Sequence, residues 1–325
     1  MKIRTILLAA AAPLAIAGAA HADAHGCGEV SITEMNWASS AVVTAVADFL
    51  MTEGYGCTVT RVPSSTNPAL ASLSETGEPD IVTELWVNAA PVYDRMDADG
   101  SIVTLAEVLS DGGQEGWWIP NYLLEAHPEL ATIDGVLANP ELVGGMFHQC
   151  PDGWACKTVN GNLAEAAGLE EAGIELFQHG SGETMATSIA AAFENEEPWF
   201  GYYWAPTSVL GRYPMTRVDI GEFDEEAYNC NADEECANPG LSAYPLGRVV
   251  TVATADFQER QPDITELMSN VVFTNEQMNA VLAWQDENNA SAEEAAVYFL
   301  TTYQDVWPNW LSDGARENLS ALIDG

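Results

Sequence analysis

One stretch decides the fold, residues 28–86, and it contains four patterned segments: GEVSITE (28–34), SSAVVTAVADFLMTE (39–53), CTVTRV (57–62) and DIVTELW (80–86). Apolar and polar residues alternate in the first segment, as in a strand with one buried face. Residues 39–53 instead place valine, phenylalanine and leucine at helical spacing, and Gly54 ends the helix. With a further helix at 68–76, the order β-α-β-α-β predicts parallel strands joined by right-handed crossovers.

The same alternation starts again after WWIP at residues 117–120. Further elements are expected as helices at 121–127, 158–165 and 182–195 and strands at 174–179, 199–204 and 249–253. Three amphipathic helices should follow at 261–269, 275–287 and 291–311, the last broken near Pro308. We therefore expect an α/β protein of two lobes, each a mostly parallel sheet flanked by helices: lobe 1 from residues 23–116 and 249–325, and lobe 2 inserted as residues 117–248. A ligand would bind in the cleft between the lobes, near the carboxyl ends of strands.

The composition excludes several function classes. The 325 residues include 49 acidic against 10 basic ones, for a net charge of −39, and 47% are hydrophobic. That apolar fraction fills a core and argues against disorder. The negative charge repels phosphates, which argues against nucleic-acid and anionic-membrane partners. Lys2 and Lys157 are the only lysines, so a lysine-rich phosphate site has almost nothing to be built from.

Residues 1–22, MKIRTILLAAAAPLAIAGAAHA, have the pattern of a secretory signal peptide. Lys2 and Arg4 precede a short apolar run, and Ala20-His21-Ala22 is a small-x-small cleavage site. The alternatives are an Ala-rich first helix of the fold and a lipid-attached Cys27. Charged and polar residues stand directly before that cysteine and disfavour the lipid anchor. We expect the mature protein to be exported.

Export into an oxidising compartment favours disulfides for an even set of six cysteines. Fifteen pairings exist in principle, and the nearest-neighbour set is our prediction: Cys27–Cys57, Cys150–Cys156 and Cys230–Cys236. A zinc site is the competing interpretation, but CxxC spacing is absent.

Tryptophans supply the first functional indication. Those on the C-terminal helices, Trp284, Trp307 and Trp310, have apolar neighbours typical of packing. Others stand at strand–loop junctions: Trp37, Trp86, Trp117, Trp118, Trp154 and Trp204. Each alone is typical of packing as well, but aromatic faces attract cations. Several at equivalent positions predict a cage for a methylated ammonium group, which cannot donate ordinary N–H hydrogen bonds.

The segment CPDGWAC (150–156) predicts a second half of such a site. A disulfide closing so small a loop would hold Trp154 rigidly and aim the backbone N–H groups of Ala155 and Cys156 in one direction. Such N–H groups form an anion-receiving nest. The alternative is a purely structural tight loop.

Patterns for catalysis or metal binding are weak. Ser181 in HGSG lacks the GxSxG spacing of a nucleophile elbow, and only His148 and His179 are plausible bases for a hydrolase. The acidic clusters 224–226 and 233–235 could hold a hard cation such as calcium, but a solvated face is the simpler interpretation. We expect no enzyme, no cofactor and no required metal.

These residues resemble one family: the periplasmic substrate-binding proteins of ABC importers for glycine betaine, choline and related methylated amines. The PDGWAC loop is similar to the family's PGWGC loop, in which a Trp packs on the trimethylammonium group and the next two backbone N–H groups take the carboxylate. ELW (84–86) and YYWAP (202–206) are similar to the family's NW and YxW positions. The resemblance implies a two-lobed periplasmic-binding-protein fold of type II. It implies ligand contacts from Trp86, Trp154 and Trp204, from Trp37 in the first lobe, and from Trp117 or Trp118 at the hinge.

Two departures from the family bear on the ligand. Choline binders carry an acid where this chain has Ser39, and some glycine betaine binders carry a histidine where it has Ala90. Both departures favour a ligand without a long polar arm. EMNWASS (34–40) and EPWFGYYWAPT (197–207) are most similar to the marine branch that binds trimethylamine N-oxide, and an acidic surface suits a salty habitat. The expected order is trimethylamine N-oxide, glycine betaine, choline.

The resemblance also implies a cellular location and partner proteins. We expect a periplasmic monomer that delivers its ligand to a membrane permease with a cytoplasmic ATPase. A sensor that presents its closed form to a receptor would share the binding chemistry and stays an alternative. An exported choline-ester hydrolase is the remote alternative.

Overall fold

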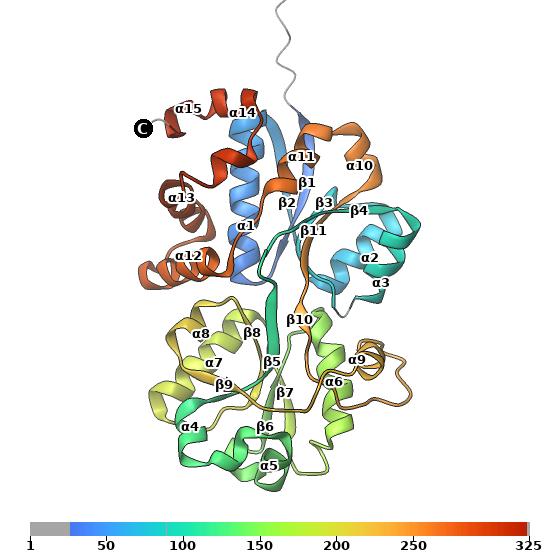
Figure 1. Cartoon of the computed structure of the whole chain (residues 1–325), viewed down its shortest axis with the longest axis vertical. Coiled ribbons are helices and arrows are strands. Elements are labelled where there is room, and N and C mark those ends of the chain that lie inside the picture. Colours follow the sequence, from blue (N-terminus) through green and yellow to red (C-terminus); the bar gives the residue numbers. More distant parts are fainter. Residues whose placement is uncertain (1–26, 89, 324–325) are drawn as a thin grey trace, which may run out of the picture.

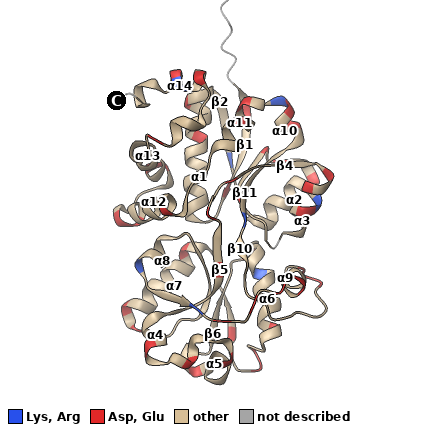
Figure 2. Cartoon of the chain, in the orientation of Figure 1, with Lys and Arg blue, Asp and Glu red and all other residues tan. Residues whose placement is uncertain are grey.

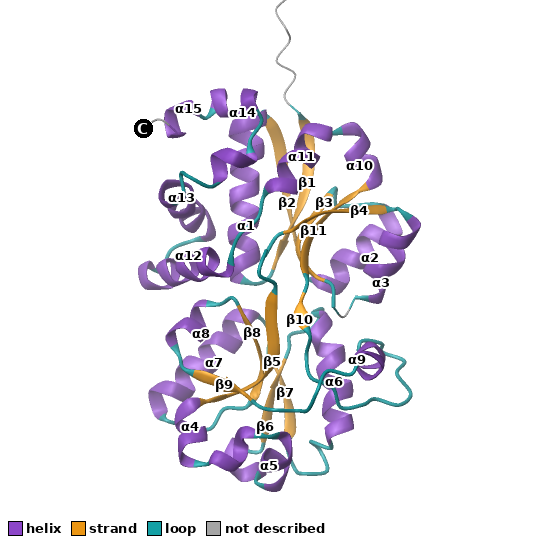
Figure 3. Ribbon diagram, viewed as in Figure 1, coloured by secondary structure: helices purple, strands orange, loops and turns teal. Residues whose placement is uncertain are grey.

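The computed structural model describes residues 27–88 and 90–323, so the expected signal peptide at residues 1–22 lies outside the described residues. Two halves, each built around its own sheet, lie one above the other in Figure 1. The first sheet has the strand order β2-β1-β3-β11-β4 and the second the order β10-β5-β8-β6-β7, with β9 paired to β5. Helices lie on both sides of each sheet (Figure 3). This is the two-lobed α/β architecture that the sequence predicts.

The first half contains the β-α-β-α-β unit. Its strands β1 and β2 pair in parallel, as do β1 and β3. The strands of this sheet are β1 (Gly28–Met35), β2 (Cys57–Ser64), β3 (Ile81–Trp86), β4 (Ile102–Glu107) and β11 (Val249–Thr254). The helices that follow β1, β2 and β3 are α1 (Ala38–Phe49), which continues as a π-helix over Leu50–Gly54, α2 (Thr66–Thr76) and α3 (Pro91–Asp99).

The second half begins at β5 (Gly113–Pro120) and ends at β10 (Leu246–Gly247). Its other strands are β6 (Met146–Gln149), β7 (Glu175–Gln178), β8 (Gly201–Ala205) and β9 (Met215–Arg217). Its helices are α4 (Asn121–Ala126), α5 (Ile133–Ala138), α6 (Ala155–Ala167), α7 (Gly182–Asn195), α8 (Ser208–Arg212) and α9 (Glu225–Asn231). Short 3-10 helices at Pro128–Ala131 and Pro140–Val143 flank α5.

Both sheets are mixed, and in each of them one strand runs against the direction of the others. β11 lies antiparallel to β3 and β4, and β5 lies antiparallel to β8. The reason is the connectivity: β5 and β11 are the strands that carry the chain out of one half and back into the other, so each enters its sheet against the local direction. The expected lobe limits, 116/117 and 248/249, stay a prediction. Strand pairing assigns residues 113–120 to the second sheet and residues 249–254 to the first.

The C-terminal helices cover the first half: α10 (Ala255–Arg260), α11 (Pro262–Asn270), α12 (Asn275–Asn288), α13 (Ala292–Thr302), α14 (Asp313–Asn318) and α15 (Ser320–Ile323). The segment expected as one broken helix at 291–311 stops at Thr302 and resumes as a 3-10 helix, Trp307–Trp310. Pro308 stands in the first turn of that short helix, where its missing N–H costs nothing. The proline therefore begins a helix instead of interrupting one.

Packing accounts for the tryptophans outside the junctions. Trp307 is fully buried and donates its indole N–H to the Leu300 carbonyl at 2.8 Å. Trp310 packs against Phe299, and Trp284 stacks on Tyr298 with ring centroids 4.5 Å apart. These three rings belong to the core of the first half, as the sequence predicts.

All three predicted disulfides are present: Cys27–Cys57, Cys150–Cys156 and Cys230–Cys236. The first ties the start of β1 to the start of β2, its parallel neighbour. The second closes the loop before α6, and the third closes the segment at the end of α9.

Acidic residues occur throughout both halves, and basic residues are few (Figure 2). Arg61 on β2 is paired with Asp48 at 2.7 Å, Glu293 at 2.8 Å and Glu34 at 3.1 Å. One arginine thus neutralises acids from α1, β1 and the start of α13. None of the described helices combines the length and the apolar character needed to span a bilayer.

Candidate functional site

A small cavity of about 30 Å³ lies where the two halves meet. Its wall is largely aromatic, with side chains from both sheets and from the loops between them. The lining residues are Trp37, Thr66, Trp86, Asn88, Glu115, Trp154, Ala155, Cys156, Tyr202 and Trp204. Six of the eight residues that the sequence predicts as ligand contacts, Trp37, Trp86, Trp154, Ala155, Cys156 and Trp204, are therefore brought together.

Three of the indole rings form a chain of edge-to-face contacts. The ring centroids of Trp37 and Trp154 are 5.3 Å apart with planes at 76°, and those of Trp154 and Trp204 are 5.0 Å apart at 82°. Trp37 comes from the first half and the other two from the second. Since edge-to-face rings present their faces in different directions, such a group can surround a small cation.

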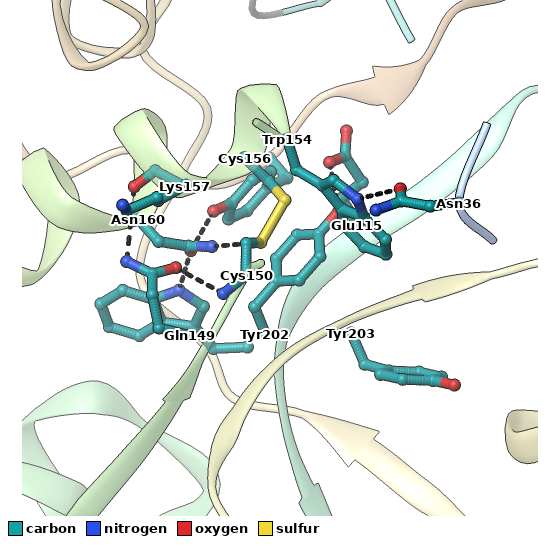
Figure 4. The surroundings of a disulfide bond; sticks show 12 residues. Asn36, Glu115, Gln149, Cys150, Trp154, Cys156, Lys157, Asn160, Tyr202 and Tyr203 are labelled. Carbon is teal, nitrogen blue, oxygen red and sulfur yellow. Dashed lines mark hydrogen bonds between the residues drawn. A yellow bond between two sulfur atoms is a disulfide. The ribbon is translucent and has the colours of Figure 1, made fainter. Parts of the chain in front are cut away.

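Hydrogen bonds fix two of these rings. Trp37 precedes α1 and donates its indole N–H to Glu84 at 2.6 Å. Trp154 precedes α6 and donates its indole N–H to the side-chain oxygen of Asn36 at 2.7 Å, a bond drawn in Figure 4. Asn36 belongs to the first half and Trp154 to the second, so this bond joins the halves across the cavity.

Two further bonds join the halves near the cavity. The backbone N–H of Asn67 donates to the carbonyl of Gly153 at 2.9 Å. The Ser208 hydroxyl of α8 donates to Asp286 of α12 at 2.6 Å. The halves are therefore joined by hydrogen bonds from α2 to the loop before α6 and from α8 to α12.

Trp86 stands at the end of β3 and packs against β5 and β10, the two strands of the second half that lie next to the crossings between the halves. A Cβ atom built on Gly113 of β5 would lie 2.1 Å from carbon atoms of the Trp86 ring, and one built on Gly247 of β10 would lie 3.0 Å from it. Real side chains do not approach so closely. Glycine at both positions is thus what lets the ring lie against these strands.

The N-terminus of α6 supplies donors to the same cavity. Ala155 and Cys156 are its first two residues, and no hydrogen bond of the described chain uses their backbone N–H groups. Unpaired N–H groups at a helix start carry partial positive charge and attract anionic oxygens. Behind them, the fully buried Asn160 side chain donates to the sulfur of Cys150 at 3.2 Å (Figure 4). The tight loop predicted from CPDGWAC is thus anchored from inside.

Glu115 of β5 is a lining residue that the sequence reasoning missed. The side chain is buried and accepts a hydrogen bond from the Tyr202 hydroxyl at 2.6 Å. Burial raises the pKa of Glu115 to about 7, against the hydrogen bond from Tyr202, which lowers it. At neutral pH this carboxyl group can therefore act as a donor or as an acceptor. Its place directly before the aromatic pair, in EGWW, was the only signal in the sequence.

Trp117 and Trp118, expected as hinge-side contacts, do not line this cavity. Trp117 is fully buried, donates to Asn160 at 2.7 Å and packs on Phe147. Trp118 donates its indole N–H to the Tyr203 carbonyl at 3.0 Å. The physical reason is the register of β5, which enters the second sheet at Gly113. The residue of β5 that reaches the cavity is therefore Glu115, and residues 117 and 118 lie deeper in the second half.

The groups considered for catalysis and metal binding have structural partners. Ser181 caps α7 and accepts from the backbone N–H of Thr184 at 3.3 Å. His148 and His179 are hydrogen-bonded to each other at 2.8 Å, and the His148 ring stacks on Trp199. Within the described ranges, 27–88 and 90–323, no group of three or more acidic, histidine or cysteine side chains is placed to hold a metal ion.

Several solved structures share this fold. The glycine betaine and L-proline binding protein ProX of Borrelia burgdorferi is 16% identical, with a TM-score of 0.73 over 91% of this chain and 100% of its own. A choline-binding protein of an ABC transporter, solved with choline, is 18% identical, with a TM-score of 0.71 over 91% of this chain and 98% of its own. Lactococcal OpuAC with glycine betaine is 17% identical, with a TM-score of 0.68 over 88% of this chain and 100% of its own. At such identities the likeness shows the fold.

The sequence itself shows the family. Residues 28–302 match the family described as the substrate-binding domain of ABC-type glycine betaine transport systems. Proteins of this kind bind a solute for a membrane transporter and are not enzymes, and those of ABC importers work outside the cytoplasm. The chain belongs to the OpuAC family of substrate-binding domains of ABC-type glycine betaine transport systems.

Proposed function

We propose that this protein captures trimethylamine N-oxide for an ABC importer and holds its methylated nitrogen between tryptophan rings. The observation that carries the proposal is a single cavity lined by four indoles, Trp37 and Trp86 from the first half and Trp154 and Trp204 from the second. A quaternary nitrogen has no N–H to donate, so ring faces are its best partners. Each desolvated contact contributes roughly 0.5–2 kcal/mol. Three or four contacts, less the entropy of association, give roughly micromolar affinity.

The oxygen end of the ligand supports the ranking among methylated amines. An N-oxide oxygen is attached directly to nitrogen and requires a donor close to the cage. The free N–H groups of Ala155 and Cys156, and the carboxyl group of Glu115 in its neutral form, line the same cavity. Glycine betaine would place its carboxylate further from the nitrogen, at the end of a methylene arm. Donors that lie close to the cage therefore favour the shorter N-oxide.

The remaining parts of the proposal follow from the family and the sequence. After removal of residues 1–22 the protein would act in the periplasm as a monomer. A membrane permease with a cytoplasmic ATPase would receive the ligand from the closed form. Ligand capture by ring faces and backbone donors requires no cofactor.

Isothermal titration calorimetry with trimethylamine N-oxide, glycine betaine and choline tests the ligand. We expect the N-oxide to bind most tightly, in the micromolar range. In the Glu115→Leu variant, which has no donor at this position, the preference for the N-oxide over glycine betaine should narrow. Absence of binding by all three compounds would overturn the proposed function, and a preference for glycine betaine would overturn the ranking.

A further inference from the structure

Glu84 is a buried carboxyl group that the cavity lining does not include. It lies in β3, two residues before Trp86, and its side chain is fully buried. Its φ of 50° is in the left-handed region, which is costly for a residue other than glycine. Conformations of this kind persist only where the surrounding structure holds them, and they cluster at functional sites.

The cause of that backbone conformation is a bulge. Leu85 pairs with Val250 and Val82 pairs with Val252, so Thr83 and Glu84 together face the single residue Thr251 of β11. The Thr83 and Thr251 hydroxyls are hydrogen-bonded at 2.9 Å, which fills the position opposite the bulge. Bulges change the direction of a side chain. This bulge directs the Glu84 side chain to the loop after β1, which carries Trp37.

Two hydrogen-bond donors from that loop bind the same carboxyl oxygen of Glu84. The Trp37 indole N–H and the Ser39 hydroxyl both donate to Oε1 at 2.6 Å. The second oxygen, Oε2, is buried and has no hydrogen-bond partner among the described residues. A buried carboxyl oxygen without a hydrogen-bond partner lowers the stability of the folded protein. Stability alone therefore does not explain a carboxyl group at this position.

We propose that Glu84 is a positioning residue, which holds the Trp37 ring at the cavity and places a negative charge behind the first-half wall of the aromatic group. The inference rests on the proposed function. A carboxylate that accepts from an indole N–H fixes the ring plane and makes the ring more electron-rich, and both effects strengthen its attraction for a cation.

Because the proposed role of Glu84 requires its negative charge, its effect on ligand affinity should depend on pH. Burial raises the pKa of Glu84 to about 7, while the hydrogen bonds from Ser39 and Trp37 and the nearby Trp86 side chain lower it. These groups, and Thr251 on the neighbouring strand, are all uncharged. The carboxylate is therefore ionised above pH 7 and neutral below it, and the contribution of Glu84 to ligand affinity should rise with pH through that range.

The experiment measures the Kd of trimethylamine N-oxide by calorimetry between pH 5.5 and 8.5 in wild type and Glu84→Gln. Glutamine keeps an oxygen for Trp37 and Ser39 but carries no charge. We expect Glu84→Gln to bind about tenfold more weakly at pH 8.5 and like wild type at pH 5.5. Glu115 is present in both proteins, so the difference between the two curves isolates Glu84.

Two further variants complete the test. Glu107→Gln makes the same charge change at an exposed position of the same sheet, where Glu107 is paired with Arg248, and should behave like wild type. Ser39→Ala removes one donor to Glu84, so the midpoint of the pH–affinity curve should shift upward; this variant carries the test if Glu84→Gln fails to fold. Wild-type affinity in Glu84→Gln at every pH, or an unmoved midpoint in Ser39→Ala, would overturn the inference. Failure of the wild type to bind any methylated amine would instead overturn the proposed function.

Discussion

Replacing Trp154 with alanine removes the ring at the centre of the aromatic group. That ring contacts Trp37 and Trp204, and its N–H donates to Asn36 in the other half. The lost cation contact is worth about 2 kcal/mol when desolvated, and the lost hydrogen bond about 1 kcal/mol. The sum of about 3 kcal/mol weakens binding about a hundredfold, since each 1.4 kcal/mol is a factor of ten.

Calorimetry with trimethylamine N-oxide measures this change directly. Trp154→Phe keeps a ring but no N–H donor and should lose about tenfold, between wild type and alanine. Trp284→Ala is the matched control, because that ring stacks on Tyr298 away from the cavity. Thermal melts show whether each variant is folded. A folded Trp154→Ala protein that binds within threefold of wild type would refute the idea that the rings hold the ligand.

Two other changes follow from close packing and from burial. Gly113→Ala places a methyl group 2.1 Å from the Trp86 ring, so ligand binding should weaken tenfold or more. Gly161→Ala, where the added methyl group has nothing within 4 Å, should bind like wild type. Equal affinities of the two variants in calorimetric titrations would contradict the role given to Trp86. Burial and His179 lower the pKa of His148 to about 4. Below pH 6.5 the His148 ring is therefore protonated in the unfolded chain but stays neutral in the folded protein. The free energy of unfolding consequently falls as the pH drops from 6.5 to 4. His148→Asn should remove about 2 kcal/mol of this loss in denaturant melts at pH 4.5, and an unchanged pH profile would refute it.

The fold was predictable to the extent that local pattern determines it. The alternation in 28–34 and the helical spacing in 39–53 describe one strand and one helix that the structure confirms. The direction of β11 was not predictable in this way, because a strand's own residues do not record which neighbour it meets. The same holds for the helix expected at 291–311, where tertiary packing of Trp307 ends the regular helix at Thr302.

The site was predictable where a residue type and its position both pointed to it. Trp154 inside a disulfide loop and Trp204 at a strand end are such cases, and both line the cavity. Glu115 and Glu84 escaped notice because a single acid within a strand resembles any solvent-facing residue. Only the tertiary structure shows that both are buried, one beside Tyr202 and one behind Trp37.

The packing of Trp86 has a consequence for inhibition of transport. One of its sides faces the cavity and another lies against Gly113 and Gly247, on the strands of the second half next to the crossings between the halves. A ligand that contacts Trp86 would therefore also act on the packing of those strands. We expect a compound that contacts the other three indoles but not Trp86 to bind without producing the arrangement of the halves that a permease recognises. Such a compound would compete with the natural ligand and block its uptake.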